Sequence, residues 1–145
     1  MDLLSEIRDA WGWAGIDPVE IVDKNSFGNL IIKDRNGKYW RLCPEEVYCE
    51  VIAKSCDEMN GLSNDPDYLG DWGMAELVEA AEKSVGPLCE DRVYCLTIPS
   101  VLGGAYDASN VKAVSIVELI RFSGDLGKQI RDLPDGAQVK LKFID

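Results

Sequence analysis

The fold is decided by one stretch of the chain, Asn29-Leu30-Ile31-Ile32-Lys33-Asp34-Arg35-Asn36-Gly37-Lys38-Tyr39-Trp40-Arg41-Leu42. The dipeptide Asn36-Gly37 is a strong signal for a two-residue hairpin turn, because both residue types accept the positive φ angles of that turn. The flanking segments Asn29–Lys33 and Lys38–Leu42 contain the β-branched and aromatic residues that strands favour. The stretch therefore predicts two antiparallel strands joined at Asn36-Gly37.

Further strands are predicted on both sides of this hairpin. Val19–Val22 is a short apolar run ahead of it, and Tyr48–Ala53 follows it as the next strand of an antiparallel meander. Three later segments have the composition or the alternation of strands, namely Arg92–Ile98, Val111–Val114 and Gln138–Ile144. Together these segments predict an antiparallel sheet.

Helices are predicted at the start of the chain and after the meander. Leu3–Trp13 has apolar residues at helical spacing. Cys56–Tyr68 is polar and rich in turn residues, which predicts a short helix followed by a loop. Asp71 is placed to cap a helix over Trp72–Ser84, whose apolar stripe has the spacing of one helix face.

A last helix is predicted from a capping box. Ser115 and Glu118 have the spacing of that motif, so a helix begins at Ser115 and runs to about Leu133, weakened by Gly124 and Gly127. The predicted fold class is α+β, with an antiparallel sheet packed by about three to four helices. Because the chain has 145 residues and no linker-like segment, we expect a single domain over residues 1–145.

The charge of the chain is concentrated in one third of its length. The stretch Glu45–Asp91 holds thirteen acidic residues against Lys54 and Lys83, a net charge of −11, and the remaining thirteen acids and thirteen bases sum to zero. A local acidic face favours a basic partner. The pI near 4.4 argues against nucleic acid and anionic membranes as partners, because both attract clustered Lys and Arg. The alternative is that these acids only keep the protein soluble.

Catalysis, metals and cofactors have little support in the sequence. The chain has no histidine, so Ser/His and Cys/His pairs are impossible. The spacing of the five cysteines lacks the short knuckles of zinc sites, and Ser63–Asp71 lacks the register of a calcium-binding EF-hand loop. We therefore expect no catalytic residue, no metal and no cofactor. An enzyme that uses paired carboxylates or a metal remains an alternative.

The location of the protein is also predicted from sequence. No apolar run approaches the ~20 residues of a membrane span. The N-terminus lacks the basic start and apolar middle of a signal peptide. We expect a cytoplasmic protein.

Glycine, proline and apolar positions of the second half carry a resemblance to a known family. They are Gly86-Pro87-Leu88, Val93-Tyr94, Ile98-Pro99, Leu102-Gly103-Gly104, Asn110-Val111 and the helix Ser115–Ile130. This half resembles the C-terminal domain of type VI secretion immunity proteins, the family that includes the antidote to a secreted DNase toxin. The segment Ile21–Ile52 is similar to sequences found ahead of that domain. Many relatives carry a GAD-like domain in front, and this chain is too short for a complete one.

The resemblance implies an immunity protein that binds a cognate toxin, and the charge pattern suggests how. Nuclease toxins carry basic surfaces that hold phosphates, which an acidic inhibitor can occlude. Trp72 is either core or an interface anchor, with Tyr68 as a second apolar contact. The expected toxin-binding residues are Glu45, Glu46, Glu50, Asp57, Glu58, Asp65, Asp67, Tyr68, Asp71 and Trp72. The alternative is a small-molecule or regulatory binding module with its pocket near the Leu102–Tyr106 loop.

Overall fold

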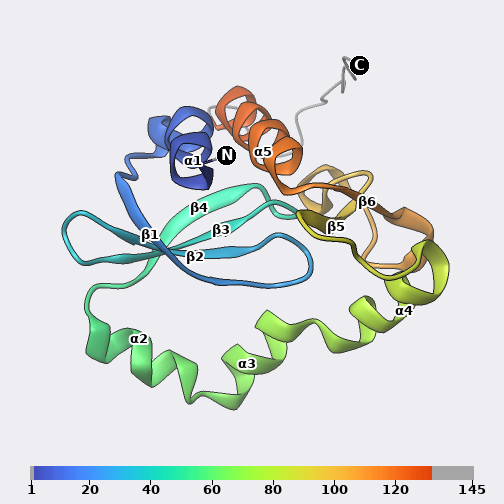
Figure 1. Ribbon diagram of the computed structural model, residues 1–145, viewed down its shortest axis with the longest axis horizontal. Coiled ribbons are helices and arrows are strands. Elements are labelled where there is room, and N and C mark those ends of the chain that lie inside the picture. Colours follow the sequence, from blue (N-terminus) through green and yellow to red (C-terminus); the bar gives the residue numbers. More distant parts are fainter. Residues whose placement is uncertain (1, 132–145) are drawn as a thin grey trace.

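The computed structural model describes residues 2–131 and is built on a four-stranded antiparallel sheet. Its strands β1 (Pro18–Lys24), β2 (Leu30–Asp34), β3 (Tyr39–Cys43) and β4 (Tyr48–Ala53) lie in the order in which the chain makes them (Figure 1). The predicted meander is therefore confirmed, with β1 and β4 as its edge strands.

The turn between β2 and β3 is fixed by Asp34 as much as by the Asn-Gly dipeptide. Gly37 has a φ of 81°, and its N–H donates to the Asp34 carbonyl oxygen at 3.1 Å. The Asp34 carboxylate accepts from the backbone N–H groups of Asn36 and Lys38 and from Trp40 Nε1, at 2.8 to 2.9 Å. By the strand bounds the connection is residues 35–38, four residues and not the predicted two, and within it only Gly37 has a positive φ.

A second, two-stranded antiparallel sheet lies beside the first. It consists of β5 (Arg92–Leu96) and β6 (Val111–Ser115), and α5 (Ile116–Ile130) follows directly. The predicted helix start is confirmed, since the Ser115 side chain accepts from the N–H of Glu118 at 3.2 Å. The predicted strand at 138–144 lies outside the described residues.

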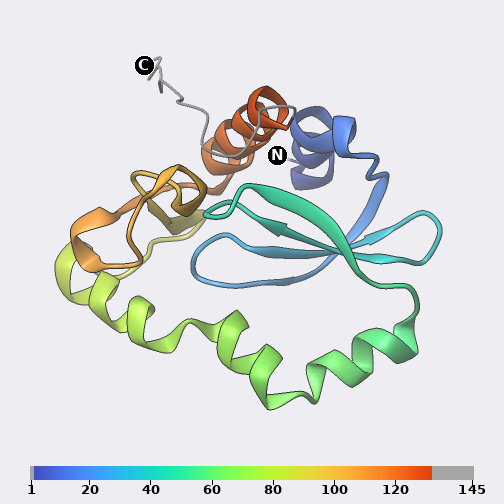
Figure 2. The same ribbon diagram turned by 180° about the vertical axis from the view of Figure 1, so that it is seen from behind.

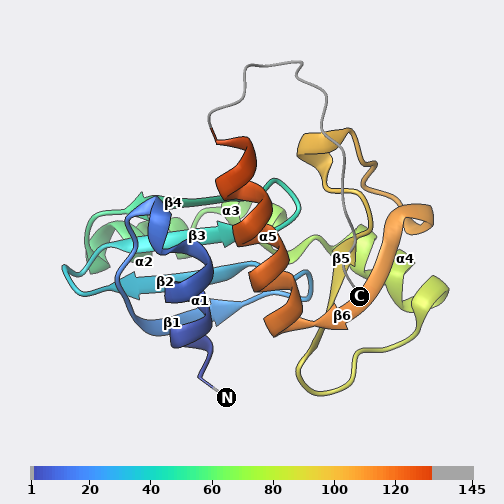
Figure 3. The ribbon, with the colours of Figure 1, turned by 90° about the horizontal axis from the view of Figure 1, so that it is seen from above.

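One face of the larger sheet is covered by α1 (Leu3–Trp11) and α5, which run side by side above it (Figures 1 and 3). The two helices meet closely at Gly124, where a Cβ atom would lie 2.7 Å from the Cβ of Ala10. The glycine that weakens α5 by helix propensity is therefore the residue that lets α1 approach it. The chain leaves α1 through a short 3-10 turn, Gly12–Ala14.

The other side of the molecule is a layer of three helices, α2 (Cys56–Ser63), α3 (Pro66–Gly73) and α4 (Ala75–Val85), seen from behind in Figure 2. The predicted loop before residue 68 and the predicted helix start at Trp72 are both wrong. Asp65 caps a separate helix, α3, and Met74 in the left-handed conformation (φ 48°) divides α3 from α4. The sequence reading missed this helix because Pro66, read as a loop residue, stands at its first turn, where proline is tolerated.

The apolar residues of β2 are buried on both faces of the sheet. Leu30 and Ile32 pack with α1 and α5 in a core cluster of thirteen buried residues. Ile31 packs on the opposite face with Met59 of α2 and Trp72 of α3, in a cluster of five. A third cluster of four buried residues places α4 against β5. The fold therefore has three layers, with the meander in the middle.

Within residues 2–131, no helix is both long enough and apolar enough to cross a bilayer.

Candidate functional site

Most acids of the acidic third of the chain lie on α2, α3 and α4 or cap them, whereas Glu46 and Glu50 lie in the β3–β4 turn and on β4. Twelve of the thirteen carboxylates in this third are exposed, and ten of these follow one another from the β3–β4 turn to the end of α4. We call these ten the acidic layer. Its members are Glu46, Glu50, Asp57, Glu58, Asp65, Asp67, Asp71, Glu76, Glu79 and Glu82.

Local helix chemistry explains why several of these acids stand where they do. Asp57 and Glu58 lie in the first turn of α2, where the partial positive charge of the helix N-terminus stabilises them. Asp65 caps α3 by accepting from the N–H of Asp67 at 2.9 Å. Lys83 pairs with Glu79 one turn away at 3.2 Å. Some of the acids therefore stabilise their own helices, and all of them are exposed.

Seven of the ten residues predicted to bind a toxin are exposed carboxylates. They are Glu46, Glu50, Asp57, Glu58, Asp65, Asp67 and Asp71. Three other acids of the layer, Glu76, Glu79 and Glu82, were missed by the prediction. Their three-residue spacing places them on one side of a helix, so the sequence did contain the signal.

Trp72 and Glu45 are buried and are not part of this surface. Trp72 is 9% exposed and packs against Ile31 and Met59, so it is a core residue and not an exposed anchor. Tyr68 stacks on it with the ring centroids 6.3 Å apart and is half-buried. On an amphipathic helix, an aromatic residue next to acids lies on the buried apolar face more often than on the exposed charged face. Trp72 of α3 lies on the buried face.

Glu45 is the inner end of a buried polar chain. Both of its carboxylate oxygens accept from Asn29 Nδ2, at 3.0 and 2.9 Å, and Asn29 Oδ1 accepts from Arg41 Nε and Nη2 at 3.1 and 3.0 Å. Burial raises the pKa of the Glu45 carboxyl above its ordinary value, and the hydrogen bonds from its own backbone and from Asn29 oppose this shift.

Arg41 connects this chain to the acidic layer. Its Nη1 donates to Asp71 Oδ2 at 2.7 Å, and its guanidinium lies 5.2 Å from the centre of the Trp72 ring. Arg41 is 8% exposed, whereas the Asp71 side chain is 70% exposed. Arg41 of β3 therefore holds α3 against the sheet, and the charge of Asp71 is paired in doing so. No sequence pattern indicates this, because the two residues are thirty positions apart.

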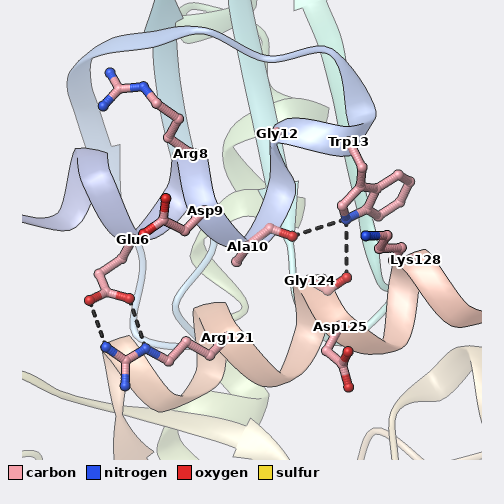
Figure 4. A pocket seen from close by; sticks show the side chains of 10 residues that line it. All are labelled: Glu6, Arg8, Asp9, Ala10, Gly12, Trp13, Arg121, Gly124, Asp125 and Lys128. Atoms are coloured by element: carbon pink, nitrogen blue, oxygen red, sulfur yellow. Dashed lines mark hydrogen bonds and ion pairs between the residues drawn. The ribbon is translucent and has the colours of Figure 1, made fainter.

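A cleft lies on the opposite side of the molecule, between α1 and α5 (Figure 4). It has a volume of about 640 Å³ and is lined by charged side chains of both signs. Trp13 Nε1 closes one end by donating to the carbonyl oxygens of Ala10 and Gly124, at 2.9 and 3.1 Å. Arg121 closes the other end with two hydrogen bonds to Glu6, at 2.8 and 2.7 Å. The sequence analysis did not predict a cleft at this position.

The carboxylates of the acidic layer are spread out and do not converge. Among residues 2–131, no group of three or more His, Cys, Asp or Glu side chains is arranged to hold a metal ion. Three of the five cysteines, Cys43, Cys49 and Cys95, are buried. Burial raises the pKa of Cys49 to about 12 and that of Cys95 to about 11, so these thiols stay protonated and unreactive at neutral pH. The arrangement suits binding of a positively charged surface.

Fold and surface together define the class: an acidic α+β protein with an extended charged layer. The family model "T6SS immunity protein Tdi1, C-terminal" matches residues 53–127, just over half of the chain, and T6SS denotes the type VI secretion system. The chain belongs to this family of immunity proteins, as the resemblance in its second half predicted. The matched part contains all three helices of the acidic layer.

A search of curated proteins finds no match. Among solved structures, the crystal structure of Atu4351 from Agrobacterium tumefaciens is similar, with a TM-score of 0.52 and 15% sequence identity. The similarity covers 83% of this chain and 61% of that one, so the chain spans less than two thirds of the length of its structural relative. At this identity the likeness concerns the fold alone.

Proposed function

We propose that this chain is a cytoplasmic immunity protein that neutralises a cognate toxin of a type VI secretion system, a toxin that cleaves nucleic acid, by covering its substrate-binding surface. The observation that carries the proposal is the acidic layer, which lies within a chain whose family is that of type VI immunity proteins. The protein acts by stoichiometric binding and needs no catalytic residue.

A nuclease is the toxin whose chemistry this surface fits best. A nuclease must hold phosphates, so its substrate site is lined by Lys and Arg. The ten carboxylates of the acidic layer would meet such a site with the charge sign of nucleic acid. Complementary charge of this kind increases the association rate more than it increases the affinity, and it makes binding sensitive to salt.

The test is a titration against the purified product of the neighbouring gene, at low and high salt. The variant Glu50→Lys/Asp57→Lys/Asp67→Lys reverses three exposed acids of the layer. We expect it to associate roughly ten times or more slowly than the wild-type protein at low salt, because long-range attraction is lost.

The matched control is Asp9→Lys/Glu118→Lys/Asp125→Lys, which changes the net charge equally but on α1 and α5, on the far side of the sheet. It should retain most of the association rate. If both triple variants lose the same fraction of the association rate, the acidic-layer mechanism is wrong and the immunity function still stands. If the wild-type chain does not bind, the product of the neighbouring gene is not its partner.

A second candidate function, a small-molecule binding module, has one observation in its favour. The cleft between α1 and α5 is large enough for a small charged ligand and presents Arg8, Lys128 and Asp125 to it. A ligand that co-purifies with the protein in native mass spectrometry, and that is lost in the Lys128→Glu variant, would support this function. The pocket expected near Leu102–Tyr106 remains a prediction.

A further inference from the structure

A second feature of the surface is apolar. The connection between β5 and β6 carries three large apolar side chains that are about half exposed: Ile98 at 45%, Val101 at 50% and Tyr106 at 46%. We call residues 98–106 the apolar loop. Single exposed apolar residues are ordinary, but three within nine positions of one loop are a local concentration that a soluble surface usually avoids.

The apolar loop is held rigidly by Asn110. The Asn110 side chain accepts from the N–H of Ile98 at 3.0 Å, and it donates to the carbonyl oxygens of Ile98 and Ala105 at 2.9 and 3.0 Å. Gly103 adopts a φ of 94°. A Cβ atom on Gly104 would collide with the backbone carbonyl of Ile98, so only glycine fits there. These contacts restrain the backbone of the loop, although three of its apolar side chains are about half exposed.

The apolar loop is fastened to the end of the acidic layer. The N–H and Oγ of Ser100 donate to the carbonyl oxygen of Glu45, at 2.8 and 2.9 Å, and Tyr106 donates to Ser100 Oγ at 3.2 Å. The next residue, Glu46, is the first exposed carboxylate of the acidic layer. Burial and the nearby charges of Glu45 and Glu46 raise the pKa of Tyr106 to about 12. The loop and the acidic layer are therefore continuous at the β3–β4 turn.

We propose, on the basis of the proposed function, that the apolar loop is the apolar part of the toxin-binding surface, at the end of the acidic layer next to Glu46. It fits a protein with an apolar depression rimmed by Lys and Arg side chains. The exposed carboxylates Glu46 and Asp107 flank the loop and would meet the basic rim. Binding energy in protein interfaces concentrates in a few apolar or aromatic residues, and ordering them before contact lowers the entropy lost on binding. The acidic layer then sets the association rate, and the loop sets the dissociation rate.

The test uses the full chain and the purified product of the neighbouring gene. The variant Ile98→Ser/Val101→Ser removes the apolar contacts but keeps the backbone groups that Asn110 holds. The matched control is Val19→Ser/Val22→Ser, which changes two valines of similar exposure, 41% and 43%, on the edge strand β1. Thermal melting of both variants checks that they fold.

We expect the loop variant to bind about ten times or more weakly, through faster dissociation and with the salt dependence of the wild-type protein. The control should bind within about twofold of the wild-type protein. If the double variant melts at a lower temperature, Val101→Ser alone gives the same comparison at the most exposed of the three apolar positions, 50% exposed. A loop variant that binds like the wild-type protein overturns this inference and leaves the proposed function standing. Failure of the wild-type chain to bind overturns both.

Discussion

The two faces of the four-stranded sheet are packed in different ways. The face under α1 and α5 has a cluster of thirteen buried residues, and the helices approach each other closely at Gly124. The face over α2 and α3 has a cluster of five buried residues and is reinforced by the polar chain from Glu45 through Asn29 to Arg41. The first face is built mainly from apolar contact, and the second adds buried hydrogen bonds and one ion pair.

This difference shows how the molecule can carry so much charge on one side. The three helices carry seven exposed carboxylates, so they cannot also offer a broad apolar face, and polar contacts must help to hold them to the sheet. Arg41 supplies such contacts, because its guanidinium contacts both the ring of Trp72 and the carboxylate of Asp71. Stability is concentrated on one face of the sheet and charge on the other.

The largest loss of stability is expected at the α1–α5 contact. Gly124→Ala places a methyl group against the backbone and Cβ of Ala10, and we expect the free energy of unfolding to fall by about 3 kcal/mol. The matched control is Gly61→Ala in α2, where a Cβ meets no atom within 4 Å. That variant should gain roughly 0.5 to 1 kcal/mol through helix propensity. Urea denaturation measures both, and equal changes would contradict the close contact.

A smaller loss is expected where Arg41 holds α3. Arg41→Ala leaves the buried Asn29 Oδ1 without its donors and removes the contacts with Asp71 and Trp72, which should lower the free energy of unfolding by about 2 kcal/mol. Arg41→Lys keeps the charge but not the planar fork, so it should recover only part of this loss. Hydrogen exchange of α3 amides should rise in both variants. Full stability in Arg41→Lys would mean that charge alone holds the helix.

The smallest effect is a pH dependence from Glu45. Its folded-state pKa is raised, so its contribution to stability is complete below the ordinary pKa of 4.5 and is lost as the pH rises through the raised value. Glu45→Gln cannot ionise and should remove this dependence, with a slope of at most about 1.4 kcal/mol per pH unit between the two proteins. Urea denaturation from pH 4 upward measures it. A constant difference between the two proteins would show that burial does not shift this carboxyl.

The regions that the sequence predicted correctly are those whose signals are local. The turn at Asn36-Gly37, the strand Tyr48–Ala53 and the capping of α5 by Ser115 each depend on residues a few positions apart. The error at α3 was also local, because a proline and several acids were read as a loop although Asp65 caps a helix there.

The composition of the candidate surface was predictable, but its geometry was not. The concentration of charge in residues 45–91 follows from counting, and twelve of the thirteen carboxylates are exposed. The burial of Glu45 and Trp72 could not be foreseen, because their partners Asn29, Ile31 and Arg41 lie on other strands.

By itself, the sequence determined the fold class, the location of the charge along the chain and the family, because hydrophobic periodicity, turn residues and residue counts are properties of short segments. Only the tertiary structure decided which acids face solvent, that Arg41 joins α3 to the sheet, and that Ile98, Val101 and Tyr106 stand exposed beside Glu46. These features arise from contacts between distant segments, and such contacts are set by the packing of the whole chain.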